Sequence, residues 1–352
     1  MNNTIIRDDI EYIIRSLPAE EWNALSAKTI LVAGANGFLP AYMVETLLSL
    51  SEQGIIQDTK IIALVRDEKK AFTRFPSYLS RKDLSILVQD IAQSFTIPGA
   101  VDHIIHAASQ ASPKYYGSDP VGTLNANVLG TNNLLSIARE KGSASFFYFS
   151  SGEVYGEVEE KSNPIKEQTY GYLDPMNVRS CYAESKRMGE TMCISWSHQY
   201  GIPVKIVRPF HTYGPGMRLD DGRVFADFVA DIVQNRNIVM KSDGSALRSF
   251  CYLADATAGF FTVLLRGRNR EAYNIGNSDV EVSVLQLATI LTGLFPERGL
   301  SVVRQQGSTT STYLKSTVNR ACPDISKARS LGWSPRYSLK EGFTRTIRSF
   351  MQ

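Results

Sequence analysis

The stretch TILVAGANGFLPAYMVETLL, residues 29–48, decides the fold. It opens with an apolar run, passes through a turn with glycines at Gly34 and Gly37, and continues in a helix-like pattern. A strand that enters a helix through such a turn is typical of a dinucleotide-binding βα unit. The third position, usually a small residue, is Pro40. Because a proline in the first helical turn lacks only an N–H that is unpaired anyway, we expect it to change local packing and to leave the phosphate site intact.

Further apolar runs follow this unit, and helix-like segments separate them. The runs are residues 60–65, 84–89, 103–108, 145–151 and 203–209. Strands that are apolar on both faces suit a parallel sheet covered by crossover helices. The sequence therefore predicts an α/β fold with a Rossmann-type, doubly wound parallel sheet.

The chain divides into three predicted parts. Residues 1–27 form an N-terminal helical extension whose apolar residues share one face. Residues 28–209 form the dinucleotide-binding domain. Residues 210–352, which begin with a polar, glycine-rich loop, form a smaller substrate-binding region with segments that return to the first domain.

Composition excludes several classes of protein. The 352 residues carry a formal net charge of only +3, so bulk charge makes no case for nucleic acid or a membrane surface. The four cysteines form no CxxC pair, which argues against a zinc site or a disulfide framework and fits a reducing cytoplasm. No apolar run reaches about 18 residues, the length that a membrane span needs. We expect a cytoplasmic protein without a metal, a nucleic-acid partner or a membrane segment.

The predicted cofactor residues lie at the ends of the strand-like runs. At the turn, the backbone of Gly34, Gly37 and their neighbours would approach a pyrophosphate whose charge lies at the helix N-terminus. The small residues after the fourth run would let the backbone pass close to the cofactor, and residues after the third run would meet the adenine. Besides the two glycines, the predicted set is Asn36, Phe38, Leu39, Asp90, Ile91, Ala107, Ala108 and Ser109.

The second run ends in Arg66 and Asp67, which point to different cofactors. An acid at this place usually accepts hydrogen bonds from the ribose hydroxyls of NAD, whereas an arginine can hold the 2′-phosphate of NADP. The sequence favours a nicotinamide dinucleotide and leaves both forms open.

A catalytic constellation follows the fifth run. Ser151 ends that run, and Tyr182 and Lys186 stand four residues apart on one helix face. We expect the ammonium to lower the tyrosine pKa, so that the phenol can act as a base near neutral pH. Ser151 can hydrogen-bond the same substrate oxygen.

In these motifs the sequence resembles the extended short-chain dehydrogenase/reductase family, specifically its nucleotide-sugar epimerases, dehydratases and decarboxylases. The resemblance runs from about residue 28 to 339. Its further carriers are HAASQASP (106–113), NVLGTNNLL (127–135), SSGEVYG (150–156), RPFHTYGPG (208–216), DGRVFADF (221–228), GSALRSF (244–250), YNIGN (273–277) and PDISKARSLGW (323–333). It implies bound NAD or NADP, a nucleoside diphosphate-sugar substrate and a 4-keto sugar intermediate.

The resemblance also implies roles for individual residues. Ser151, Tyr182 and Lys186 match the catalytic triad, of which the tyrosine and lysine also meet the cofactor. The implied substrate-binding residues are Ser112, His211, Arg223 and Arg248, with Arg248 on the diphosphate or sugar acid and Arg223 near the base. His211 departs from the family, which often has asparagine there. A homodimer is implied as well, paired through helices within residues 127–141 and 181–200.

Glu153 and Gly152 bear on the reaction. By resemblance, Glu153 is a catalytic residue of the decarboxylases and 4,6-dehydratases, and simple 4-epimerases typically lack it. Many dehydratases carry an aspartate where this chain has Gly152, and that acid protonates the leaving hydroxyl. The sequence is most similar to the UDP-glucuronate decarboxylases; a 4,6-dehydratase comes second and a 4-epimerase third. A catalytically silent cofactor-binding relative is the alternative from another class.

Overall fold

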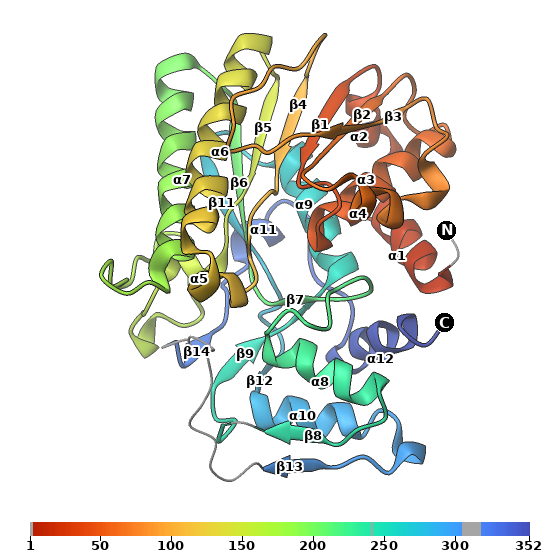
Figure 1. Cartoon of the computed structure of the whole chain (residues 1–352), viewed down its shortest axis with the longest axis vertical. Helices are drawn as coiled ribbons and strands as arrows, with labels where there is room; N and C mark the ends of the chain where they lie inside the picture. Colours follow the sequence, from red (N-terminus) through yellow and green to blue (C-terminus); the bar gives the residue numbers. More distant parts are fainter. Residues whose placement is uncertain (1–2, 241, 305–317) are drawn as a thin grey trace.

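A computed structural model describes residues 3–240, 242–304 and 318–352. In these ranges one lobe is built on a seven-stranded sheet, and a smaller lobe lies beside it (Figure 1). The strand order is β11-β6-β5-β4-β1-β2-β3, and all neighbours in this sheet are parallel. The predicted Rossmann-type sheet is confirmed. The strands are β1 (Thr29–Ala33), β2 (Lys60–Val65), β3 (Leu84–Val88), β4 (His103–His106), β5 (Ser145–Phe149), β6 (Val204–Pro209) and β11 (Glu271–Ile275).

Both faces of the sheet are buried, as parallel strands require. Along β1, Ile30 and Val32 belong to one apolar cluster, whereas Leu31 and Ala33 belong to another on the opposite face. Figure 1 shows the long helices α6 and α7 together over one face and α3 and α9 over the other. The helices of this lobe are α2 (Ala19–Trp22), α3 (Phe38–Glu52), α4 (Glu68–Arg74), α5 (Lys114–Ser118), α6 (Pro120–Lys141), α7 (Ser180–Tyr200), α9 (Leu253–Arg266) and α11 (Ser326–Arg329).

The N-terminal helix α1 (Thr4–Arg15) packs on the main fold. Ile10, Ile13 and Ile14 share its buried face, and burying each such side chain contributes about 1.5–3 kcal/mol. Tyr12 adds a polar tie, since its hydroxyl donates to Asp255 on α9 over 2.6 Å.

The smaller lobe is assembled from segments after residue 211. Its helices are α8 (Val224–Val233), α10 (Val284–Thr292) and α12 (Leu339–Ser349). Its short strands form three small sheets: β7 (Thr212–Tyr213) with β10 (Cys251–Tyr252), β8 (Ile238–Met240) with β13 (Val302–Arg304), and β12 (Glu281–Ser283) with β9 (Leu247–Ser249) and β14 (Arg320–Ala321). Short 3-10 helices lie at η1 (Asn23–Leu25), η2 (Pro76–Tyr78), η3 (Gly152–Tyr155), η4 (Glu160–Ser162) and η5 (Pro296–Arg298). Among the helices in the described residues, none has the length and apolar character to cross a bilayer.

Candidate active site

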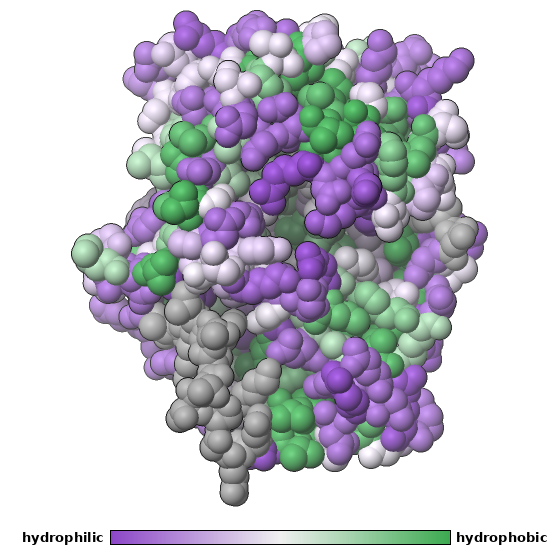
Figure 2. Space-filling model, in the orientation of Figure 1, coloured by the Kyte–Doolittle hydropathy of each residue, from purple (hydrophilic) through white to green (hydrophobic). Residues whose placement is uncertain are grey.

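A cleft of about 800 Å³ runs between the two lobes. Figure 2 shows the surface hollowed at this level. Its walls include residues of the turn after β1 and residues that directly follow β2, β4, β5 and β6, together with segments of the smaller lobe. Ligands of open α/β sheets bind at the carboxyl ends of the strands, so the cleft lies where the fold places a site. Its volume is in the range of small-molecule sites.

The turn after β1 has the geometry that a pyrophosphate needs. Gly34 has φ +79°, and a Cβ there would lie 2.7 Å from the Cα of Ala108, so only glycine fits. Gly37 caps α3 without a side-chain hydrogen bond, which leaves the first N–H groups of this 15-residue helix available to an anion. Pro40 lies in that first turn, as predicted. The Ser109 hydroxyl is buried in the cleft wall with no partner among the described residues. These features fit a bound dinucleotide.

Most of the predicted cofactor residues line the cleft: Asn36, Gly37, Phe38, Leu39, Arg66, Ala107, Ser109, Tyr182 and Lys186. Gly34 and Ala108 lie behind this wall, in close contact with each other. Asp90 and Ile91 do not line the cleft. The Asp90 carboxylate accepts from the Ala92 N–H, and the Ile91 side chain is buried against α6. Asp67 also lies outside it, since its carboxylate caps α4 by accepting from the Lys70 N–H over 3.0 Å.

Replacing Gly37 with aspartate should abolish dinucleotide binding, because it places bulk and negative charge against the pyrophosphate. Even a Cβ added at residue 37 would lie only 3.0 Å from the Gly34 carbonyl oxygen. Calorimetric titration with the dinucleotide checks this. Ser80→Asp adds the same charge at an exposed position and should bind normally. Unchanged affinity of Gly37→Asp would show that the cofactor binds elsewhere.

The structure brings the predicted catalytic residues together. Ser151 caps η3 just after β5, where its hydroxyl accepts from the Glu153 N–H over 3.1 Å, and it lies close enough to Tyr182 to lower the pKa of that phenol. The Tyr182 ring stacks on Tyr116, with ring centres 5.0 Å apart. One turn further along α7, the Lys186 ammonium donates to the Phe149 carbonyl of β5 over 2.7 Å. The strand end and the first turns of α7 therefore hold the three functional groups at the cleft wall.

The acidities of this pair differ from the prediction. Burial raises the pKa of Tyr182 to about 12, and the hydrogen bond from Ser151 only partly opposes that shift. Burial also lowers the pKa of Lys186 to about 7. The Lys186 ammonium lies 6.0 Å from the Tyr182 ring centre and donates to a backbone carbonyl, so its effect on the tyrosine pKa stays a prediction. Desolvation of the phenolate dominates.

Glu153 lines the cleft and is held by a residue to which the sequence analysis assigned no role. Both carboxylate oxygens accept from the guanidinium of Arg179, over 3.2 and 3.3 Å. Arg179 precedes α7 and stands three residues before Tyr182. Its guanidinium also lies over the ring of Tyr116, 5.8 Å from the centre. In the sequence, Arg179 is the first residue of the stretch RSCYAESKR (179–187), which also contains Tyr182 and Lys186.

Gly152 is covered by an aromatic ring. A Cβ at this position would lie 3.2 Å from three carbon atoms of the Phe210 ring, tighter than most real contacts. Phe210 is itself buried and packs with Tyr155 and Ile165. An acidic side chain at residue 152 would therefore need Phe210 to move.

The predicted substrate-binding residues all line the cleft, and several of them already make protein contacts. The Ser112 hydroxyl donates to the Asp221 carbonyl, and Arg223 donates to the Ala111 carbonyl over 2.8 Å. Both contacts join the 109–116 segment to the loop before α8. Arg248 lies on β9 and donates to the carbonyls of residues 247, 318 and 319.

Among the predicted substrate-binding residues, His211 has an imidazole side chain that is uncharged. Burial, together with the charges of Arg248 and Arg223, lowers the pKa of its imidazole to about 3. Its Nδ1 atom is buried without a partner among the described residues. A neutral ring with one unpaired nitrogen can hydrogen-bond a ligand, which fits the substitution of histidine for asparagine.

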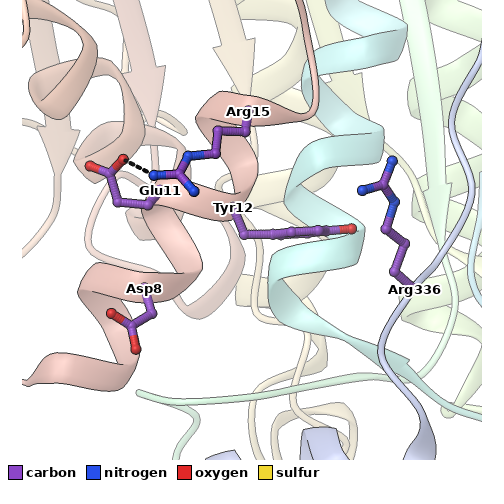
Figure 3. A pocket seen from close by; sticks show the side chains of 5 residues that line it. All are labelled: Asp8, Glu11, Tyr12, Arg15 and Arg336. Atoms are coloured by element: carbon purple, nitrogen blue, oxygen red, sulfur yellow. Dashed lines mark ion pairs between the residues drawn. The ribbon is translucent and has the colours of Figure 1, made fainter.

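A second hollow, of about 390 Å³, lies on the outer face of α1 (Figure 3). Asp8, Glu11, Tyr12, Arg15 and Arg336 line it, and Figure 3 shows the Glu11–Arg15 ion pair at its edge. That pair joins exposed side chains one helical turn apart, a contact of small energetic value. In the described part of the chain, no three His, Cys, Asp or Glu side chains gather closely enough to hold a metal ion.

Comparison with known proteins shows the family of this chain. A family model described as the NAD dependent epimerase/dehydratase family matches residues 30–276. UDP-glucuronic acid decarboxylase 6 of Arabidopsis thaliana is 33% identical over 315 residues, which cover 89% of this chain and 86% of the relative. UDP-glucuronic acid decarboxylase 1 of Xenopus tropicalis is 30% identical over 352 residues, covering 98% of this chain and 78% of the relative.

A solved structure extends the match to the fold. The UDP-N-acetylglucosamine 4-epimerase of Methanobrevibacter ruminantium superposes with a TM-score of 0.79 at 19% identity, covering 93% of this chain and 99% of that structure. This likeness supports the fold alone. With the family model spanning well over half of its residues, this chain belongs to the NAD-dependent epimerase/dehydratase family of enzymes.

Proposed function

We propose that the protein decarboxylates a nucleoside diphosphate-linked hexuronic acid, with UDP-glucuronic acid as the first candidate, and releases CO₂ and a nucleotide pentose. The similarity to decarboxylases over most of the chain supports the substrate class. The observation that carries the reaction type is a carboxylate in the cleft, Glu153, beside a position with no acid, Gly152.

The residues of the cleft fit the roles that such a reaction needs. Bound NAD or NADP would supply a nicotinamide that can hold the hydride of C4 of the sugar between the oxidation and the later reduction. Tyr182 takes the C4 hydroxyl proton, with Ser151 hydrogen-bonded to the tyrosine and positioned to share the same substrate oxygen. Lys186 lies one turn further along α7 and donates to the Phe149 carbonyl at the end of β5.

The resulting 4-ketone activates the carboxylate on C5 for loss as CO₂. The C5–C6 bond breaks, its electron pair moves onto C5 and the C4 oxygen as an enolate, and CO₂ departs. A proton then adds at C5, and Tyr182 gives its proton back to the C4 oxygen when C4 is reduced again. Glu153, which lines the cleft, would take up and return the C5 proton, and Arg179 would compensate its charge next to an acidic substrate.

Dehydration at C6 would need one more group. The leaving hydroxyl must be protonated, and Gly152 has no side chain, while the Phe210 ring occupies the space above it. Loss of CO₂ needs no such acid. Mass spectrometry of the products from a panel of nucleotide sugars tests the proposal, because a pentose product and a 4-keto-6-deoxy product differ in mass.

We also propose a homodimer paired through α6 and α7. These helices pack on each other at one side of the sheet (Figure 1). They expose large apolar side chains: Val121, Leu124, Leu129, Met188, Ile194 and Tyr200. Light scattering at micromolar concentration should give twice the mass of the 39.1 kDa chain, and Leu129→Asp should shift it toward the monomer. A monomeric wild-type protein would contradict the pairing.

The four cysteines are free and buried, which supports a place in the reducing cytoplasm.

A further inference from the structure

A set of polar contacts crosses the cleft from one lobe to the other. On one side is the segment of residues 109–116, which lies between β4 and α5 and includes the start of α5, and on the other is the loop of residues 214–223, which precedes α8. We call these two stretches the mouth segments. Where Ser112 contacts Asp221 they are 109 positions apart in the chain, so the contact depends on how the two lobes lie together.

The inner contacts join residues that line the cleft. The Ser112 hydroxyl donates to the Asp221 carbonyl, and the Arg223 guanidinium donates to the Ala111 carbonyl over 2.8 Å. Arg223 also pairs with the Asp221 carboxylate over 3.2 Å, within the same loop. Because Ser112 and Arg223 are predicted substrate-binding residues, the way the mouth segments meet fixes where these two side chains lie.

The outer contact is an ion pair behind the cleft wall. The Lys114 ammonium pairs with the Asp220 carboxylate over 3.1 Å and also donates to the Asp220 carbonyl over 3.2 Å. Arg218 holds the same carboxylate from within the loop, over 2.7 and 2.9 Å. Arg218 and Lys114 lower the pKa of the Asp220 carboxyl, so the pair is charged at neutral pH. Lys114 and Asp220 do not line the cleft, so either can be changed without removing a residue of its wall.

The two lobes are joined more firmly at another place. The side chain of Asp9 on α1 is fully buried and accepts hydrogen bonds from Tyr42 on α3, Tyr252 on β10 and Arg345 on α12, over 3.1, 2.7 and 2.7 Å. Figure 1 shows α1 and α12 at one side of the molecule and α5 at the other. A buried polar network is costly to break, whereas an exposed ion pair contributes little. The lobes can therefore separate more easily at the mouth segments than at α1.

The Lys114–Asp220 pair has the properties of a contact that opens readily. The two side chains are 33% and 66% exposed, so water and salt screen their attraction. The loop that carries Asp220 contains no helix or strand. Met217, near the start of this loop, is buried in the main apolar cluster. The tip of the loop can therefore move away from α5 while its root stays in place.

We propose that the Lys114–Asp220 ion pair is a latch that holds the mouth segments together over a bound nucleotide sugar, and that its opening sets how fast this ligand enters and leaves. Lys114 and Asp220 are positioning residues, which act through the neighbouring Ser112 and Arg223. The inference rests on the proposed nucleotide-sugar site, and it holds whichever reaction follows.

Hydrogen exchange of the full chain without ligand, followed by mass spectrometry, tests the latch itself. Lys114→Gln should make the amides of the mouth segments exchange about two- to fivefold faster, the factor that one exposed ion pair contributes. Adding Lys114→Gln to Asp220→Asn should have no further effect, because both changes remove the same pair. Lys114→Arg, which keeps the charge, should restore slow exchange. High salt should bring the wild type close to Lys114→Gln.

The matched control is Lys161→Gln. It removes an exposed lysine whose ion pair, with Glu159, lies within one short segment away from the cleft wall. Exchange in the mouth segments should stay at the wild-type rate in this variant. Equal exchange in the wild type and in Lys114→Gln would overturn the proposal.

Binding kinetics test the effect on the ligand. The probe is UDP, which has no sugar to react, and surface plasmon resonance follows it on the immobilised full chain in the presence of NAD⁺. Loss of a direct contact mainly raises the dissociation rate. A looser latch raises the association and dissociation rates together, so we expect both to rise about two- to fivefold in Lys114→Gln while Kd changes less than either.

The outcomes separate the latch from the proposed function. A rise in the dissociation rate alone, or no change in either rate, would overturn the proposal. Failure of UDP to bind the wild type would instead contradict UDP-glucuronic acid as the substrate, and the exchange rates of the mouth segments would then decide on the latch.

Discussion

Tyr182→Phe is expected to lower turnover by roughly 10²–10⁴-fold, the usual contribution of one acid–base group. The change removes the phenol oxygen that takes the C4 hydroxyl proton in the proposed reaction. It leaves the ring, which is stacked on Tyr116, and the helix that carries it in place.

The variant should still fold and bind the dinucleotide, since the hydroxyl contributes one hydrogen bond with Ser151. Unfolding temperature and dinucleotide affinity check these two points, and initial rates of product formation check the main one. Tyr172→Phe, an exposed tyrosine that also lines the cleft, is the matched control and should keep its activity. Near-normal turnover of Tyr182→Phe would remove this residue from the mechanism.

Glu153→Gln should lose turnover by a similar factor while it keeps the cofactor and the fold. The amide has nearly the shape of the carboxylate, and its oxygen can still accept from Arg179. What it loses is the ability to accept or return the C5 proton. Arg179→Lys, which keeps the charge but not the paired donors, should lower turnover less than Glu153→Gln and should raise KM for the acidic sugar.

Rates and dinucleotide affinities measured side by side separate these effects. Glu157→Gln removes a carboxylate from the same cleft without touching the Arg179 pair, so we expect it to behave like the wild type. If Glu153→Gln turned over at the wild-type rate, Glu153 would be no more than a strand-end residue paired with Arg179. Interconversion of C4 epimers by that variant and by the wild type alike would point to an epimerase.

The features that could be predicted from the sequence are those that depend on neighbours along the chain. The Gly34–Gly37 turn, the position of Pro40 and the helical spacing of Tyr182 and Lys186 are local, and the structure has each of them where the pattern placed it. The apolar runs likewise predicted six strands of the central sheet, and β11 adds a seventh.

What could not be predicted depends on contacts between distant segments. Arg179 reaches Glu153 only because the segment between them folds back from β5 to the start of α7. The raised pKa of Tyr182 results from burial against residues distant in sequence, such as Tyr116, which no local motif reports. The choice between Arg66 and Asp67 was open in the sequence because both are adjacent to β2. In the structure Asp67 caps α4 and does not line the cleft, whereas Arg66 does.

The most direct test of the proposed reaction uses UDP-glucuronic acid labelled with carbon-13 at C6. The purified protein is incubated with it, and dissolved carbon dioxide and the nucleotide sugar are followed together by NMR. We predict that the label leaves as CO₂ and bicarbonate while an unlabelled UDP-pentose accumulates in equal amount. In deuterated water, one deuterium should enter at C5. Label that stays in the sugar, as a C4 epimer, would contradict the account. So would a 4-keto-6-deoxy product when a neutral nucleotide hexose is supplied instead.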